Sequence, residues 1–465
     1  MTIKSATELV ALIRSREVSA FEVVEAHLQR IERLNPQLNA IVTVAEDALE
    51  RARQIQATSS TSLLHGLPIT VKDTIDTAGL RTTAGSLARA NRVPNEDAPA
   101  VARLKAAGAI ILGKTNTPEM AIPYETDNAV FGRTNNPHNP LMTPGGSSGG
   151  EAAAIAACLS PAGIGSDLSG SIRVPAHFCG IAGLKPTTGR VPMEGHTPAA
   201  TGPLSLGACI GPMARHVEDL ALLFQVLADP TQFEMGGTDL IPDPRELRGL
   251  RVGWYVDDGV APVSNEIQAA VQAAARALAD AGLEVSEASP PGVSRGSHLW
   301  VELFAAAAQK EIVAQYEGNE SDAGPQVAAL LNRSKKAKDT LEERIATAEP
   351  LADAVLERER LREDLLAWMK KTPLILAPVG ATAAFKHGAD RAAVGDESIS
   401  IFRAFSYSQT FNVLGLPSLA VPVARTSAGM PIGVQVIGAP FEERTVFAAA
   451  RVIEEAFGGW RMPEG

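Results

Sequence analysis

Two glycine-serine segments are the most informative feature of this chain: Pro144-Gly145-Gly146-Ser147-Ser148-Gly149-Gly150 and Gly165-Ser166-Asp167-Leu168-Ser169-Gly170-Ser171-Ile172-Arg173. Glycine loses the most backbone entropy on folding, so it persists where the chain needs positive φ or close approach to main-chain N–H groups. The alanine-rich stretch Glu151 to Leu159 between them predicts a helix. The first segment then leads into a helix N-terminus, which favours developing negative charge. The serines predict one site for nucleophilic chemistry, with a pair of flexible linkers as the alternative.

Apolar runs on both sides of these segments predict alternating strands and helices. Strands are expected at Leu67 to Asp73, at Ala109 to Gly113 and at Thr372 to Pro378, and helices at Pro99 to Ala107 and Asn265 to Ala281. Alternation of this kind indicates an α/β fold whose sheet is covered by helices on both faces.

The N-terminal region reads as helical. Ser5 and Ser19 each precede an amphipathic stretch and are expected to cap a helix. The dipeptide Asn35-Pro36 is expected to end the second helix, and a third is expected from Val44 to Ile55.

Composition argues against several classes of protein. The 465 residues carry a net charge of −11 without a basic run, which argues against nucleic acid and anionic membrane surfaces as partners. The three cysteines have no close-pair spacing, so neither a zinc site nor a disulfide framework is indicated. The chain has no apolar run of about 18 residues and no signal-peptide core at its start, so we expect a cytoplasmic protein.

The first segment contains a Gly-x-Ser-x-Gly pattern that offers Ser148 as a nucleophile. That motif requires a strand directly before the serine, and three prolines between residues 136 and 144 argue against one. Of the histidines, His138 and His177 lie near the segments, where a structural role is expected for both. Lys72 is the remaining candidate base, because it ends a predicted strand and a desolvated lysine can stay neutral and accept a proton.

In these features the sequence resembles the amidase signature family. The matching stretches are Val71-Lys72-Asp73, the Gly-Gly-Ser-Ser-Gly-Gly segment, Asp167 to Pro175, Gly183 to Arg190, Gly211 to Arg215, Asn412 to Pro417 and Gly433 to Gly438. The likeness covers about residues 5–230 and 370–458. It implies a single large domain, 1–465, with a central mixed, twisted β-sheet. Within it we expect N-terminal helices at about 5–60, a catalytic core at about 61–230 and 370–458, and a variable substrate-pocket segment at about 245–370.

The resemblance also implies a Ser-cisSer-Lys triad. Carried over by position, Ser171 is the nucleophile, and Ser147, entered through a cis peptide bond, relays the proton to Lys72. The family's oxyanion hole falls on the main-chain N–H groups of Leu168, Ser169, Gly170 and Ser171, with supporting roles for Ser148, Asp167 and Arg173. Ser169 stands where the family commonly has glycine, and because serine tolerates positive φ poorly, the oxyanion geometry or the pocket floor is expected to differ there.

The expected activity is hydrolysis of a small-molecule amide, such as an aryl or alkyl amide, an anilide or a carbamate, through an acyl-enzyme. No metal or organic cofactor is expected, and a homodimer is an open possibility. Two alternatives remain: the amidase subunit of a glutamyl-tRNA amidotransferase-like complex, and a non-catalytic binding protein on the same scaffold. The segments 119–128, 193–206 and 298–333 are candidate linings of the substrate pocket.

Overall fold

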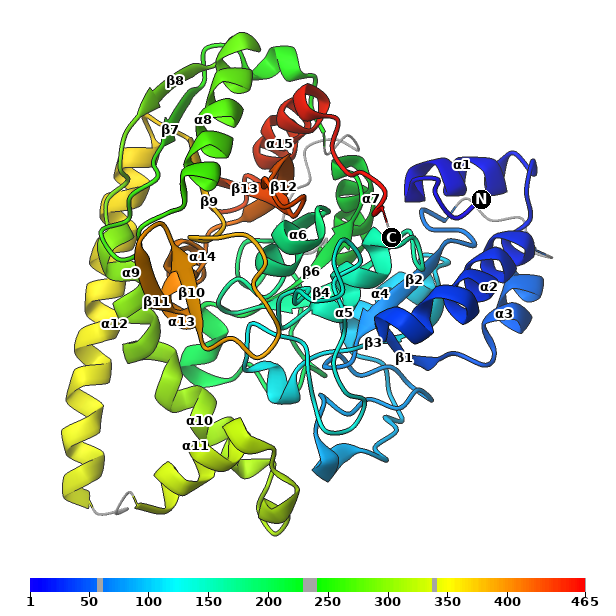
Figure 1. The fold of residues 1–465 in the computed structure, drawn as a ribbon, viewed down its shortest axis with the longest axis horizontal. Helices are drawn as coiled ribbons and strands as arrows, with labels where there is room; N and C mark the ends of the chain where they lie inside the picture. The colour runs from blue at the N-terminus through cyan, green and yellow to red at the C-terminus, as the bar shows by residue number, and fades with distance from the viewer. Residues whose placement is uncertain (57–61, 229–240, 337–340, 465) are drawn as a thin grey trace.

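The computed structural model describes residues 1–56, 62–228, 241–336 and 341–464, and within them one mixed sheet of eleven strands forms the centre of the molecule (Figure 1). The strand order across the sheet is β1 (Ile41–Val44), β3 (Ile110–Thr115), β2 (Pro68–Lys72), β4 (Ala162–Asp167), β6 (Cys209–Ala214), β5 (Ala182–Lys185), β12 (Ser418–Arg425), β13 (Pro431–Gly438), β9 (Leu374–Pro378), β7 (Arg251–Trp254) and β8 (Glu284–Glu287).

Strand direction divides this sheet into zones. Strand β2 runs parallel to β3 and β4, and β7 runs parallel to β8 and β9. Between these zones, the neighbours from β4 to β9 are all antiparallel, and β1 pairs antiparallel with β3 at the edge. The expected mixed sheet in a single domain is therefore confirmed. The domain boundaries expected near residues 60 and 230 fall on the chain outside the described residues.

Helices cover both faces of the sheet. Alternate side chains of its strands point to opposite sides, and both sides carry apolar residues that are buried under helices. In β12, Leu419 and Val421 join one hydrophobic cluster, and Ala420 joins another. The first face is covered by α4 (Pro99–Ala106), α7 (Val217–Leu227), α15 (Glu443–Phe457) and α8 (Asn265–Asp280). The other face carries α5 (Gly149–Ala156), α6 (Arg173–Cys179) and α14 (Ser406–Val413).

The N-terminal helices α1 (Ala6–Arg14), α2 (Ala20–Leu38) and α3 (Ala48–Gln56) lie at the β1 end of the sheet (Figure 1). Ser5 and Ser19 cap α1 and α2, each in a capping box with the glutamate three residues later. The expected end at Asn35-Pro36 is wrong. Helix α2 passes through Pro36, where the missing N–H removes a single bond from the last turn, and ends at Asn39 in a left-handed conformation.

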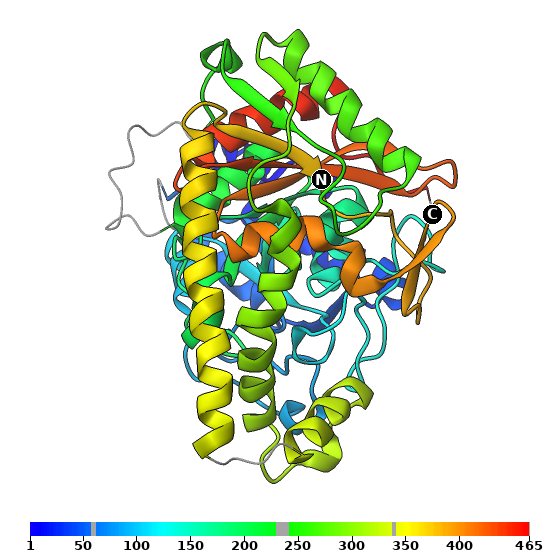
Figure 2. The ribbon, with the colours of Figure 1, turned by 90° about the vertical axis from the view of Figure 1, so that its left-hand side faces the viewer.

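The segment 245–370, expected to vary around the pocket, begins with β7, α8 and β8, which are part of the central sheet and its cover. The described residues that follow are mainly helical: α9 (Val293–Trp300), a π-helical turn (Val301–Ala305), α10 (Ala306–Ala314), α11 (Pro325–Lys336) and α12 (Leu341–Met369). The long α12 runs beside α9 and α10, as the yellow and green helices show in Figure 2. A hairpin of β10 (Arg391–Val394) and β11 (Glu397–Ser400) then leads through α13 (Ile401–Ala404) to α14.

The cysteines and the longer helices can be compared with what the sequence indicated. Cys158, Cys179 and Cys209 are buried free thiols. Among the helices of the described ranges, none combines the length and the apolar content needed to cross a bilayer.

Candidate active site

Lys72 lies at the carboxyl end of β2 and is fully buried. Its Nζ is hydrogen bonded to Ser147 Oγ at 2.7 Å and to Ser166 Oγ at 2.9 Å. Burial lowers the pKa of Lys72 to about 7, against the opposing pull of the negative charges of Asp167 and Glu151. An amine with this pKa is substantially neutral at physiological pH, so it can accept a proton from a serine.

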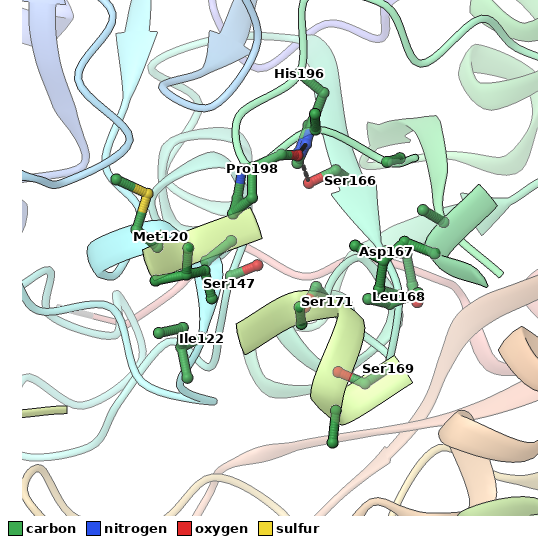
Figure 3. Close-up of a pocket in the computed structure, with 18 of the residues that line it drawn as sticks. Met120, Ile122, Ser147, Ser166, Asp167, Leu168, Ser169, Ser171, His196 and Pro198 are labelled. Carbon is green, nitrogen blue, oxygen red and sulfur yellow. Dashed lines mark hydrogen bonds between the residues drawn. The ribbon is translucent and has the colours of Figure 1, made fainter. Parts of the chain in front are cut away.

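Ser147 and Ser171 bring the two glycine-serine segments to one cavity (Figure 3). The peptide bond between Gly146 and Ser147 is cis, as the family resemblance implies. The Ser148 N–H donates to the Ser171 carbonyl at 3.1 Å, which ties the segments together directly. Within the described part of the chain, Ser147 Oγ is bonded to Lys72 alone, and Ser171 Oγ has no hydrogen-bond partner.

The loop from Leu168 to Ser171 presents main-chain N–H groups next to the nucleophile candidate. The Gly170 N–H donates to Asp167 Oδ1 at 2.7 Å, so it is already engaged. Across the described residues, the N–H groups of Leu168, Ser169 and Ser171 have no acceptor, which leaves three of the four expected donors for an oxyanion.

Glycine is required in this loop at position 170 rather than at position 169. Gly170 has a φ of 104°, and a Cβ added there would lie 2.8 Å from Ser408 Cβ. Ser169 is not among the residues with positive φ, so a serine fits its backbone without strain. The expected difference at this position therefore reduces to a hydroxyl group on the cavity wall.

Asp167 and Arg173 form a fully buried ion pair that holds the loop from beneath. Asp167 accepts from the Arg173 guanidinium at 3.1 Å and from Asn412 Nδ2 at 2.9 Å. Burial opposes ionisation of this carboxyl group, but the charge and hydrogen bonds of Arg173 outweigh it and keep the Asp167 pKa well below its usual range. Arg173 in turn donates to Gln435 Oε1 on β13, which anchors the loop to the sheet.

Two aromatic side chains fix the loop carbonyls from the cavity side. Tyr124 Oη donates to the Ser169 carbonyl, and Trp300 Nε1 donates to the Leu168 carbonyl, each at 2.7 Å. Because a peptide unit turns as a rigid plane, holding these carbonyls also fixes the direction of the N–H group that follows each one.

The cavity has a volume of about 400 Å³, within the usual range for small-molecule sites. Each of the three expected segments contributes to its lining. Its walls are mainly apolar. The lining residues are Met120, Ala121, Ile122, Tyr124, Met193, His196, Pro198, Ala199, Ala200, Leu204, Ala208, Trp300, Ala305, Ala308, Gln309, Ile312, Leu330 and Phe402, together with Ser147, Ser166, Asp167, Leu168, Ser169 and Ser171 from the two glycine-serine segments. Among these described lining residues, Asp167 alone carries a charge, and it is already paired.

The side chains that sequence reasoning set aside lie in the scaffold. His138 bonds to the Cys179 carbonyl, and His177 accepts from the Gly433 N–H. Ser148 is fully buried and bonds to the main chain of Ser166, so the Gly-x-Ser-x-Gly pattern points at a structural serine.

Three residues of the site were not identified from the sequence. Ser166 joins Lys72 to His196, whose Nε2 lies 2.9 Å from Ser166 Oγ. Glu151 is buried in the first turn of α5, and burial raises its pKa to about 7. Ser166 lies one residue before Asp167, and that position is its only signal in the sequence. His196 and Glu151 have no such signal, because their contacts with the site depend on the tertiary fold.

Comparison with known proteins identifies the family of the chain. The family model described as Amidase matches residues 22–447. The chain belongs to the amidase signature family. It is 38% identical to a glutamyl-tRNA(Gln) amidotransferase subunit of Roseiflexus sp. (strain RS-1), over 96% of this chain and 94% of that protein. It is 32% identical to human fatty-acid amide hydrolase 2, over 99% and 90% of the two chains.

Solved structures extend the likeness to the whole fold. A bacterial aryl acylamidase of the amidase signature family superposes with a TM-score of 0.85 at 27% identity, over 97% of this chain and 96% of that one. The protein is thus an enzyme of a family that acts on amide C–N bonds. Its relatives include both small-molecule amidases and a subunit of an amidotransferase.

Proposed function

We propose that this amidase hydrolyses a neutral, largely apolar small-molecule amide, such as an anilide, an alkyl amide or a carbamate, through an acyl-enzyme on Ser171. The observation that carries the proposal is the buried Lys72, hydrogen bonded to Ser147, at the end of a cavity that holds Ser171 and otherwise offers mainly apolar walls. No metal or organic cofactor is needed for the steps that follow.

The mechanism uses Lys72 as the base. Ser171 Oγ attacks the amide carbonyl carbon while its proton passes to Ser147, whose own proton passes to Nζ of neutral Lys72. The N–H groups of Leu168, Ser169 and Ser171 receive the developing oxyanion, an interaction typically worth about 3–4 kcal/mol per donor. The relay then returns the proton to the departing amine nitrogen. Water then attacks the ester at Ser171 while its proton passes through Ser147 to Lys72. The same proton returns to Ser171 Oγ as the ester C–O bond breaks, which releases the acid and restores the free serine.

The alternative role, as part of a tRNA-dependent amidotransferase, draws support from the 38% identity to the Roseiflexus protein. The cavity lining argues against it. A zwitterionic amide such as free glutamine brings an ammonium and a carboxylate group, and burying either one unpaired is costly. Among the described residues that line the cavity there is no arginine or lysine, and Asp167 is engaged by Arg173.

The test is a hydrolysis assay on a panel of anilides, aliphatic amides, carbamates and glutamine, with wild-type protein and Ser171→Ala. We expect turnover of apolar amides by the wild type, little turnover of glutamine, and none by Ser171→Ala. Selective glutamine hydrolysis, or a requirement for partner proteins encoded nearby, would favour the amidotransferase alternative. Activity of Ser171→Ala at the wild-type rate would refute the assignment of the nucleophile. Failure of the wild type to react with a fluorophosphonate would instead favour a non-catalytic binding protein.

A further inference from the structure

His196 lies in the cavity wall on a segment that is fixed against the turn following Lys72. The Asp76 N–H donates to the Gly195 carbonyl at 2.9 Å, and the Thr197 N–H donates to the Thr74 carbonyl at 2.8 Å. An isolated antiparallel bridge joins Ile75 to His196 itself. The turn and the histidine segment are therefore one unit, which places the imidazole ring over Ser166 (Figure 3).

The tautomer of His196 follows from its two partners. Nδ1 lies 2.8 Å from the Pro198 carbonyl oxygen, and a carbonyl can only accept, so Nδ1 carries the proton. Nε2, 2.9 Å from Ser166 Oγ, is then an acceptor in the neutral ring. Burial and the nearby Lys72 lower the His196 pKa to about 4, which keeps the ring neutral at physiological pH.

This tautomer determines where the single proton of Ser166 points. The hydroxyl has two neighbours, His196 Nε2 and Lys72 Nζ. Because Nε2 is an acceptor, the Ser166 proton is donated to His196, and Ser166 Oγ must receive an N–H from Lys72. Neutral Lys72 has one lone pair and bonds to two serines. With Ser166 accepting, the lone pair is available to Ser147.

We infer that His196 is a positioning residue that, through Ser166, aims the lone pair of Lys72 at Ser147 and so sets the direction of the proton relay. The inference rests on the proposed roles of Lys72, Ser147 and Ser171. Without a hydrogen-bond acceptor at position 196, the Ser166 hydroxyl donates its proton to the lone pair of Lys72. That lone pair is then no longer available to Ser147.

The experiment measures one chemical step that does not depend on the natural substrate. A small alkyl fluorophosphonate reacts with the nucleophile, and the second-order rate constant of inactivation is recorded against pH. The variants are His196→Leu, which has no acceptor, His196→Gln, whose side-chain oxygen restores one, Ser166→Ala, and the Ser166→Ala/His196→Leu pair. His138→Ala serves as the matched control, because His138 also bonds to a carbonyl but does not line the cavity.

We expect His196→Leu to react about tenfold more slowly, as loss of one directing hydrogen bond implies. His196→Gln should recover most of the rate, and His138→Ala should match the wild type. In the Ser166→Ala background, His196→Leu should change the rate less than about twofold, because nothing remains for it to direct. The acid limb of the His196→Leu profile should move to lower pH, since a hydroxyl donated to the lone pair stabilises neutral Lys72.

The other ionisable groups that face Lys72, namely Asp167 at the end of β4 and Glu151 on α5, are unchanged in these variants.

Equal losses of rate from His196→Leu in the presence and absence of Ser166 would overturn the inference, and so would a wild-type rate for His196→Leu. A His196→Leu protein that is slow because it is misfolded would show the same loss in both backgrounds. Labelling of wild-type Ser171 without hydrolysis of any apolar amide would refute the proposed substrate class and leave this inference standing.

Discussion

Replacing Lys72 with methionine should abolish activity and stabilise the fold at neutral pH. The side chains are similar in length, but methionine brings no charge into the buried site. In the unfolded chain the lysine has its ordinary pKa of 10.5, and burial lowers this to about 7 in the folded protein. Between pH 7 and pH 10.5, Lys72 is protonated in the unfolded chain and largely neutral in the folded protein. The free energy of unfolding of the wild type therefore rises with pH across this window and is lowest at and below pH 7.

The magnitude follows from the width of that window. At pH 7 the cost to the wild type is about 4 kcal/mol relative to pH above 10.5, and about 2 kcal/mol of it is regained by pH 9. Methionine escapes this cost but loses the hydrogen bonds to Ser147 and Ser166, worth about 1 kcal/mol each. The variant should therefore be more stable by about 2 kcal/mol at pH 7 and about equal to the wild type at pH 9. For a chain of this length, 2 kcal/mol corresponds to roughly 2 °C in Tm.

The assay is thermal unfolding of both proteins at pH 7, 8 and 9, with the exposed Lys370→Met as control. Taking the difference between variant and wild type at each pH removes the titration of every group that does not interact with Lys72. The difference should shrink steadily for Lys72→Met and stay constant for Lys370→Met. A Lys72→Met difference in Tm that is the same at all three pH values would refute the argument, because it would mean that Lys72 stays charged in the folded state.

Three further predictions concern the relay and the oxyanion loop. Because the base must be neutral, kcat/KM on an apolar anilide should fall about tenfold per pH unit below about pH 7, the pKa of Lys72, as an initial-rate profile from pH 5 to 8 will show. Trp300→Phe removes the donor to the Leu168 carbonyl, whose peptide unit carries the Ser169 N–H, and should lower kcat about tenfold, as steady-state kinetics will show. Ser169→Gly should cost about 0.4–1 kcal/mol of unfolding free energy through added freedom of the unfolded chain, measured by denaturant titration; a gain in stability would mean that residue 169 is strained.

The sheet and most helices could be predicted because their signals are local. The run from Leu67 to Asp73 is apolar and bounded by turn residues, and it forms β2. Strand β1 was missed, and Val44 was assigned to the helix that follows it. That strand has only four residues, and its side chains become steadily less buried along it. What makes it a strand is its pairing with β3, far along the chain, which no local pattern records.

The residues of the candidate site also fall into those that the sequence predicts and those that it does not. Lys72, Ser147 and Ser171 could be placed because each lies in a recognisable stretch, and their mutual roles remain a proposal. His196 could not be found, because its segment carries no motif and its function comes from pairing with the turn after Lys72. The engagement of the Gly170 N–H by Asp167 was also beyond the sequence, since it depends on the orientation of one carboxylate.

The electrostatics of the site support the proposed role of Lys72 as a base, although a buried carboxylate lies close to it. An unpaired Asp167 would favour the ammonium form of Lys72 and remove the lone pair that the relay needs. Arg173 lies against Asp167 and offsets its charge, so burial remains the dominant influence on the amine. The same Asp167 orients the loop by holding the Gly170 N–H. The Asp167–Arg173 ion pair thus holds the loop in place and does not favour the protonated form of Lys72. An isolated carboxylate in that position would hold the loop but would raise the pKa of Lys72.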